Sequence, residues 1–140
     1  MKLSARSRYA TRLLLALADN TSDAPVRTVT LSEITGVTVQ FIEQIIRPLK
    51  KAGLVTSVRG AAGGYYLARP PERITLHDIV RHTEGSINIA ECLDCEESCN
   101  KIDSCQTRSA WERVSRAIEQ ELESMTLAEL MEPSESSEAN

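Results

Sequence analysis

The sequence predicts a mainly α protein in which a winged helix-turn-helix domain precedes a long C-terminal dimerisation helix. Three patterns support this fold. The first is a helix followed by a short helix, a Gly and another helix. The second is a pair of short β-type runs around a Gly-rich loop, and the third is a long amphipathic helix near the C-terminus. The 140 residues are 41% hydrophobic but include only one Trp, one Phe and three Tyr. Such a composition favours a helical core packed with Leu, Ile, Val and Ala.

Two helices are expected near the N-terminus. The first, YATRLLLALADN, places apolar residues on one helical face, and Asn20 is suited to its end. The second, TVTLSEITG, is stopped by Gly36. Its start is open, because a capping box of Thr30 with Glu33 leaves little more than one turn, whereas a start near Thr28 gives about two turns.

The next segment, VTVQFIEQIIRPLKKAG, predicts a clearer helix that Thr38 caps and Gly53 ends. Pro48 lies inside it and should bend the helix or tighten its last turn. An apolar stripe at helical spacing is formed by Val39, Ile42, Ile45, Ile46 and Leu49. The residues outside that stripe are Gln40, Phe41, Glu43, Gln44 and Arg47.

Two β-type runs, LVTSVRG and YYLAR, then form a hairpin whose loop needs the backbone freedom of glycine. In a winged helix-turn-helix, the second helix of the motif enters the major groove of DNA, where Gln40, Gln44 and Arg47 can contact base edges. Arg59 at the wing tip is placed to reach a minor groove or a phosphate. The alternative is that these are ordinary solvated side chains. The predicted DNA-binding residues are Thr38, Gln40, Phe41, Glu43, Gln44, Arg47, Arg59, Gly60, Gly63 and Gly64.

The charge distribution favours a polyanion-binding first half. Residues 1–70 hold ten Lys and Arg against four Asp and Glu, a net charge of +6. Residues 71–140 hold six against sixteen, a net of −10, and together the halves give the overall −4. Duplex DNA is the expected partner of the basic half. Two oppositely charged faces that only keep the protein in solution are the alternative.

The second half begins with a short helix that a Thr75–Asp78 capping box starts. Later, TRSAWERVSRAIEQELESM carries an apolar stripe too narrow to form a core alone, so it must pack on the winged domain, on a second copy, or on both. A homodimer is expected because such proteins read two-fold symmetric sites. The predicted parts are the DNA-binding domain (1–84), a cysteine-rich loop (85–106), the dimerisation helix (107–131) and a disordered tail (132–140).

All four cysteines lie in one acidic stretch, CLDCEESCNKIDSC, and are predicted metal ligands: Cys92, Cys95, Cys99 and Cys105. No apolar run is long enough to span a membrane, and LLLALA is too short for a signal peptide, so a cytoplasmic location is expected. There, clustered thiolates indicate an iron–sulfur cluster or zinc rather than structural disulfides. A metal-free thiol switch and four unligated surface thiols are the remaining alternatives.

The chain resembles the Rrf2 family of bacterial transcription regulators, and within it the branch that binds iron–sulfur clusters. The resemblance covers nearly the whole chain and rests on KLSARSRYA, FIEQIIRPLKKAGLVTSVRGAAGGYYLAR, ITLHDIV, the cysteine stretch and TLAEL. It implies a homodimer with crossed C-terminal helices and a cluster held by Cys92, Cys99 and Cys105. Six and five residues separate these three cysteines, and the family pattern has about five in each gap.

Two positions depart from the family pattern. Arg108 stands where the cluster-binding branch has a His as fourth ligand, and Arg8 stands where a related nitric-oxide-sensing branch has an Asp. Cys95 could replace them, and Asp94 or Asp103 is a weaker candidate. Four cysteines are compatible with either cluster type, and we favour [2Fe–2S] over [4Fe–4S].

The predicted function is a DNA-binding transcriptional regulator that senses iron–sulfur cluster or redox status through its cysteines. The alternative is a regulator of the same family that uses a thiol switch or zinc. Nothing in the sequence indicates an enzyme, because there is no Ser/His/Asp set, phosphate-binding loop or paired His motif.

Overall fold

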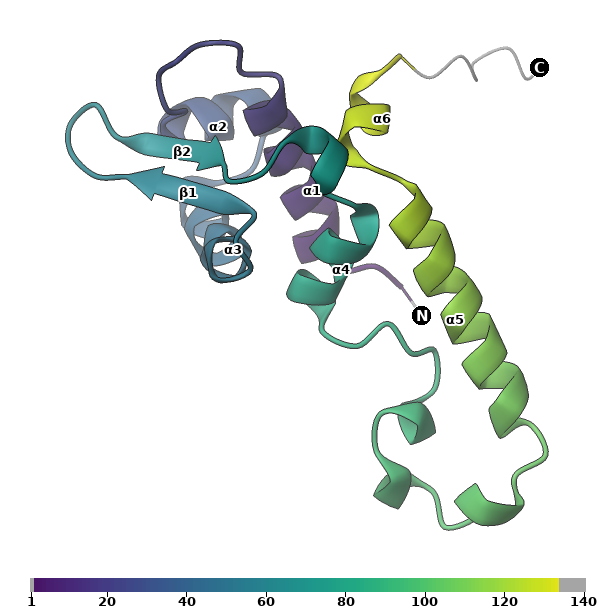
Figure 1. Cartoon of the computed structure of the whole chain (residues 1–140). Helices are drawn as coiled ribbons and strands as arrows, with labels where there is room; N and C mark the ends of the chain where they lie inside the picture. The colour runs from purple at the N-terminus through teal and green to yellow at the C-terminus, as the bar shows by residue number, and fades with distance from the viewer. Residues whose placement is uncertain (1, 134–140) are drawn as a thin grey trace, which may run out of the picture.

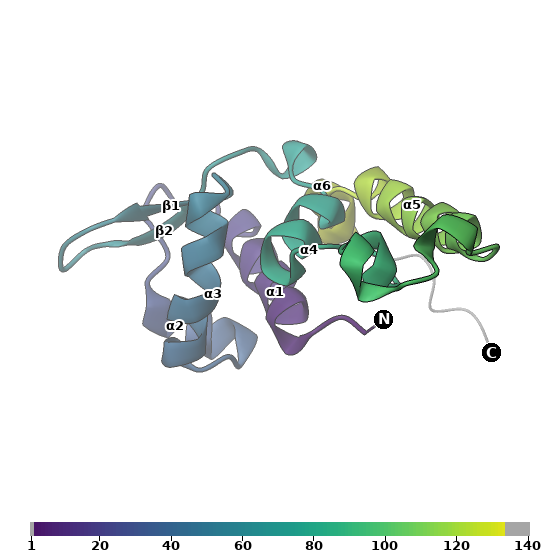
Figure 2. The same cartoon turned by 90° about the horizontal axis from the view of Figure 1, so that it is seen from below.

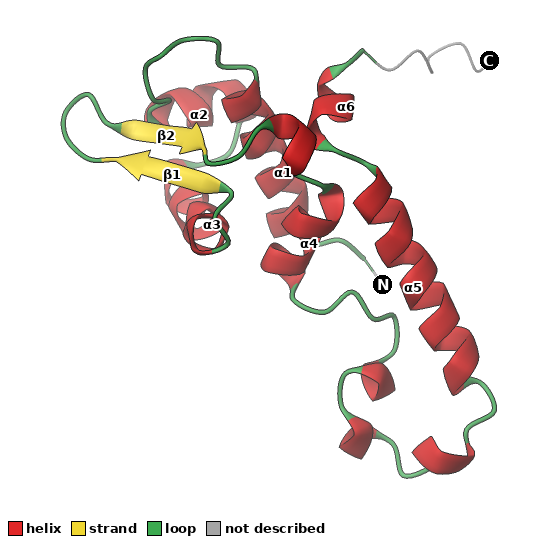
Figure 3. Ribbon diagram, viewed as in Figure 1, coloured by secondary structure: helices red, strands yellow, loops and turns green. Residues whose placement is uncertain are grey.

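The computed structural model describes residues 2–133 and is mainly helical, with one two-stranded sheet (Figures 1 and 3). Most of the predicted disordered tail, residues 134–140, lies outside the described residues. Within those bounds, no helix is both long and apolar enough to cross a membrane. The main elements are α1 (Ala5–Ala18), α2 (Thr28–Thr35), α3 (Val39–Lys51), β1 (Val55–Val58), β2 (Gly64–Leu67), α4 (Leu76–Glu84), α5 (Arg108–Ser124) and α6 (Leu127–Met131).

The predicted helix-turn-helix is formed by α2 and α3. The longer start of α2 is the correct one, because the helix begins at Thr28, and the alternative Thr30–Glu33 box is not its start. Gly36 ends α2 with a φ of 73°, a left-handed conformation that favours glycine. The Thr38 hydroxyl caps α3 by accepting a hydrogen bond from the N–H of Phe41 at 3.3 Å.

A core of aliphatic side chains joins α1, α3 and α4. The predicted stripe of α3 is buried at Ile42, Ile45, Ile46 and Leu49, whereas Val39 at its first turn is half-buried. The helix continues through Pro48 to Lys51. Because these side chains face inward, the opposite face of α3 is left to solvent.

The wing is the antiparallel hairpin of β1 and β2, which pairs Val55 with Leu67 and Val58 with Gly64. Beside it, Val26 forms an isolated bridge with Tyr65. A side chain at position 64 would collide with the backbone of Val26, so Gly64 is required by this close approach. The wing is therefore fastened to the segment that leads into α2.

The predicted capping box begins α4. Asp78 Oδ2 accepts from the N–H of Thr75 at 3.0 Å, and Thr75 Oγ1 accepts from the N–H of Asp78 at 3.1 Å. Three short 3₁₀ turns, η2 (Glu91–Leu93), η3 (Glu96–Ser98) and η4 (Ile102–Ser104), then form the cysteine-rich loop. Another, η1 (Pro71–Arg73), connects β2 to α4.

The predicted dimerisation helix, 107–131, is divided into α5 and α6, because the backbone is extended at Met125 and Thr126. Thr126 caps α6 and forms an isolated bridge with Thr75. Two backbone hydrogen bonds accompany it, from Leu76 N–H to the Met125 carbonyl (2.9 Å) and from Leu127 N–H to the Ile74 carbonyl (2.7 Å). These contacts hold the C-terminal end of α5 against the winged domain.

Leu127 belongs to the core of the winged domain, with no exposed surface, although it lies far along the chain. The N-terminal end of α5 extends away from the wing and carries the cysteine-rich loop with it (Figure 1). The C-terminal end of α5 is therefore attached by one buried residue and a short backbone bridge.

Replacing Leu127 with Ala should lower the free energy of unfolding by about 2–5 kcal/mol, because it leaves a cavity in a packed core. Urea denaturation followed by circular dichroism measures this change. The matched control is Leu130→Ala in the same helix, where 38% of the residue is exposed and little change is expected. Equal effects of the two substitutions would contradict the burial of α6 in the core.

Candidate nucleic-acid interface and cysteine-rich loop

The solvent-facing side of α3 carries most of the predicted base-contacting residues. Gln40, Glu43, Gln44 and Arg47 are all exposed, on the face opposite the buried stripe. Thr38 is also exposed, and its hydroxyl is engaged in capping the helix. The structure thus presents amide and guanidinium groups together, as required of a helix that reads base edges in a major groove.

Phe41 lies differently from its predicted neighbours. It is half-buried and meets the ring of Tyr9 edge to face, with ring centroids 5.6 Å apart and planes at 88°. The structure therefore gives Phe41 a packing contact between α3 and α1 in place of the expected open position. The guanidinium of Arg12 lies over the same Tyr9 ring, 5.3 Å from its centroid.

Sequence reasoning missed two cations beside the recognition helix. Arg6 of α1 and Lys51 at the end of α3 line a hollow of about 380 Å³ together with Gln44, Arg47 and Pro48. Arg6 belongs to the first helix, so only the tertiary fold brings it to this surface. Its position in the basic segment KLSARSRYA was the available signal.

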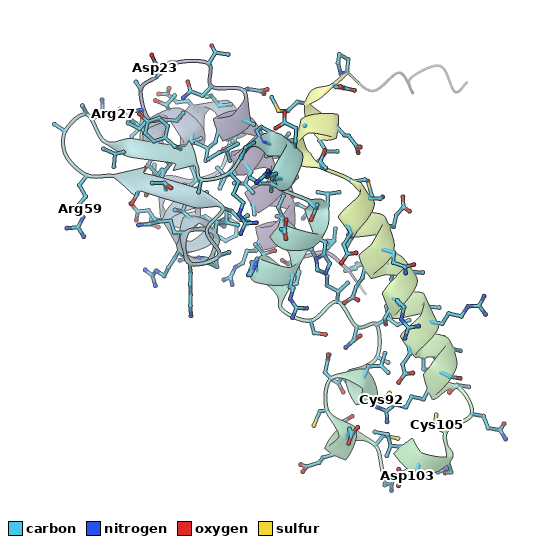
Figure 4. All side chains as sticks on the ribbon, viewed as in Figure 1. Asp23, Arg27, Arg59, Cys92, Asp103 and Cys105 are labelled. Atoms are coloured by element: carbon cyan, nitrogen blue, oxygen red, sulfur yellow. The ribbon has the colours of Figure 1, made fainter. Side chains whose placement is uncertain are left out.

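The wing places Arg59 and Gly60 in exposed positions at its tip, and Gly60 has a φ of 110°. Gly63 and Gly64 are half-buried, and a side chain at either position would meet backbone atoms. Both glycines therefore serve the backbone geometry of the wing. Figure 4 shows the Arg59 side chain pointing out from the tip, clear of the strands.

The cysteine-rich loop lies at the other end of the molecule, between α4 and the start of α5. Figure 4 shows Cys92 and Cys105, from its two ends, in this same region. Cys92 and Cys99 are half-buried, while Cys95 and Cys105 are exposed, and all four are free thiols. Within residues 2–133, no three His, Cys, Asp or Glu side chains converge in the geometry of a metal site. The donors are of the kind that iron–sulfur clusters use, so ligation would require the loop to draw its thiols together.

Asp94 is already engaged by the segment that follows α4. Its carboxylate accepts hydrogen bonds from the Ser86 hydroxyl and from Asn88 Nδ2, the latter at 2.7 Å. These bonds, first from Ser86 and then from Asn88, lower the pKa of Asp94. Asp94 therefore joins η2 to the first residues of the loop, and it would have to give up these hydrogen bonds to bind a metal. Asp103, the other acidic candidate, is exposed.

Arg108, which stands where a ligand was expected, joins the loop to α5. Its guanidinium lies 3.3 Å from Glu112 and 3.7 Å from Glu96, so it connects the loop to the first turn of the helix. Both glutamates are well exposed, and such surface pairs contribute little stability. The position thus carries a fixed positive charge beside the last cysteine.

Cys105 lies beside the start of α5, and its sulfur is 3.3 Å from the Thr107 hydroxyl. The pKa of the Cys105 thiol is lowered, first by hydrogen bonding to the Thr107 hydroxyl, then by the Thr107 N–H, and to a smaller extent by Arg108. These groups stabilise the thiolate, which is the form that binds metals and attacks electrophiles.

The apolar stripe of α5 is only partly covered within one chain. Trp111 is 43% exposed and Val114 is 42% exposed, whereas Ser115 is buried. Ser115 faces the segment after α4 and accepts a hydrogen bond from the N–H of Ile89 at 3.1 Å. One side of α5 therefore packs on its own chain, and Trp111 and Val114 remain open on another.

Comparison with known proteins places these features in one family. Residues 3–133 match the model of Rrf2, described as an iron-dependent transcriptional regulator. A protein named rrf2 from Nitratidesulfovibrio vulgaris is 40% identical over 131 residues, covering 94% of this chain and 87% of that protein.

Two solved structures share the fold over almost their whole length. The first is CymR of B. subtilis, described as the global cysteine regulator (TM-score 0.75, 34% identity, 94% of this chain and 96% of that one). The other is T. potens IscR (TM-score 0.75, 36% identity, 100% of this chain and 93% of that one).

Thr107→Val should raise the pKa of Cys105, because it removes the hydroxyl that contributes most to lowering it. In a variant whose only thiol is Cys105, the rate of iodoacetamide alkylation follows the thiolate and so measures that pKa. The midpoint of the pH–rate curve should move to higher pH on substitution. An unchanged midpoint would contradict the contribution of Thr107, and Thr107→Ser, which keeps the hydroxyl, is the control.

Proposed function

Because the chain belongs to the Rrf2 family of transcriptional regulators, we propose that it binds an operator in duplex DNA as a homodimer and senses iron–sulfur cluster or redox status through its cysteine-rich loop. The matched family and relatives are transcriptional regulators, which confirms the prediction that the chain is not an enzyme. The observation that carries the DNA-binding part is the exposed polar face of α3 beside a wing that ends in Arg59.

In the proposed complex, α3 and the wing would contact different parts of the DNA. Gln40, Gln44 and Arg47 on α3 offer the hydrogen-bonding groups that distinguish bases in a major groove. Arg59, held at the wing tip, supplies a positive charge for the neighbouring minor groove or the backbone. Arg6 and Lys51 add charge beside α3, which supports tight but salt-sensitive association.

Dimerisation through α5 is supported by its incompletely covered stripe. Trp111 and Val114 lie on the same helix and leave apolar surface exposed to solvent, and a second copy of α5 would cover that surface. A two-fold dimer would present two α3 helices to two half-sites. The C-terminal attachment of α5 to the winged domain would then fix how far apart those helices lie.

Sensing is assigned to the loop because it holds all four cysteines of the chain. The relatives of similar fold include one named IscR and one described as a global cysteine regulator. Four soft thiol donors within one loop support an iron–sulfur cluster held by Cys92, Cys99 and Cys105, with Cys95 as the fourth ligand. We favour [2Fe–2S] over [4Fe–4S]. When bound, such a cluster supplies a redox-active centre.

The protein's own contacts offer a route from the loop to the DNA-binding surface. Asp94 ties the loop to Ser86 and Asn88 after α4, and Arg108 ties it to α5. A change in the loop would therefore act on the residues that follow α4 and on the start of α5. Control of DNA binding requires only that the two loop arrangements favour different placements of those helices.

The proposed function predicts that the affinity for DNA falls steeply with salt concentration and that Arg59 of the wing contributes to this affinity. A duplex selected by the parent protein from a random pool should bind with log affinity falling linearly against log salt concentration. Arg59→Ala should weaken binding, as measured by fluorescence anisotropy. Arg73→Ala, an exposed arginine of η1 away from the wing, is the matched control and should bind as the parent does. Failure to select any duplex would contradict the proposed function.

The proposed cluster predicts iron and sulfide in equal amounts after anaerobic purification, with a visible absorption spectrum. Cys92→Ala, Cys99→Ala and Cys105→Ala should each lose that iron, because each removes a thiolate ligand. They should also change which DNA sites are bound while the fold survives. Ser98→Ala, in the same loop, is the control. One zinc per chain, or no metal at all, would instead support the zinc or thiol-switch alternative.

A further inference from the structure

A cationic groove lies between the wing and the start of α2, apart from the base-contacting face of α3. Its volume is about 490 Å³. Three positive side chains from three parts of the fold line it: Arg27 before α2, Lys50 in the last turn of α3, and Arg59 on the wing. The described lining residues include no Asp or Glu, so the charge of the groove is uncompensated there. Such a groove favours an anion.

The walls of the groove are suited to a close approach by that anion. Gly63 and Gly64 line it without side chains, and a side chain at either position would meet backbone atoms. Thr28 and Ser57 bring hydroxyl groups that can donate hydrogen bonds. Hydroxyl donors and positive side chains are the groups that bind phosphate in proteins.

The position of the groove indicates which phosphate it would meet. Figure 2, viewed from below, shows the hairpin projecting beside α3, with α2 on the same side. When α3 lies in a major groove and the wing tip in the next minor groove, the strand between those grooves must pass between the two elements. The groove lined by Arg27 and Arg59 borders the wing and reaches α3 at Lys50, so a strand that passes between the two elements would run beside it.

We propose that this groove binds one backbone phosphate of the DNA strand that separates the groove read by α3 from the groove reached by the wing. Arg27 and Lys50 are its positioning residues. The inference rests on the proposed DNA-binding function and adds a contact that carries no base information. A contact of this kind fixes how deeply the wing is seated and so sets the register of α3 on its site.

The test compares the salt dependence of DNA binding in Arg27→Ala, Lys50→Ala and the double variant, with the selected duplex and an unrelated duplex as probes. Each lost phosphate contact should reduce the slope of log affinity against log salt by about 0.9. The loss of affinity should be the same for both duplexes. Arg27→Lys, which keeps the charge, should restore most of the binding, and Arg73→Ala is again the control.

The outcomes distinguish a failure of the phosphate-binding proposal from a failure of the proposed DNA-binding function. Parent-like slopes in both alanine variants, with a parent that binds its duplex, would overturn the groove and leave the proposed function intact. A parent that binds no duplex would overturn both. Inorganic phosphate, added at constant ionic strength, tests whether a free anion and the DNA backbone compete for the groove. It should displace DNA from the parent more readily than from the double variant, and equal displacement from both proteins would overturn the assignment of the groove to a backbone phosphate.

Discussion

The C-terminal end of α5 is held by the burial of Leu127 in the winged domain, beside the Thr75–Thr126 bridge. The core that receives Leu127 includes residues of α1 and Ile74, so the attachment depends on a core formed mostly by the first half of the chain. This attachment sets where α5 leaves the winged domain, and the hydrogen bond from the Ile89 N–H to the Ser115 hydroxyl holds the middle of the helix beside the segment after α4.

Local signals predicted the fold well wherever a structure is decided by neighbouring residues. The caps at Thr38 and at Thr75 with Asp78 formed as the sequence indicated, because each needs only residues three positions away. Tertiary contacts were not predictable in this way. Phe41 was expected on the open face and packs on Tyr9, Leu127 was expected on a dimerisation helix and enters the core, and Arg6 joins α3 from another helix.

The same distinction between local and tertiary signals applies to the two candidate sites, the DNA-binding surface and the cysteine-rich loop. The residues of α3 and of the wing tip could be named from periodicity, because a buried stripe defines the face that remains open. The grouping of Cys92, Cys95, Cys99 and Cys105 in one loop was evident, but their arrangement in space was not, since a loop of short turns has no repeating geometry. The engagement of Asp94 by Ser86 and Asn88 likewise depends on how the loop folds back on its own first residues.

The length of α5 amplifies small changes of its angle to the winged domain. At a rise of about 1.5 Å per residue, its 17 residues span about 25 Å from the attachment near Leu127 to the cysteine-rich loop. A tilt of about 5° about the Leu127 attachment would move the other end of the helix by about 2 Å. In the proposed dimer, a displacement of this size in α5 would change the separation of the two recognition helices, which must match half-sites about 34 Å apart.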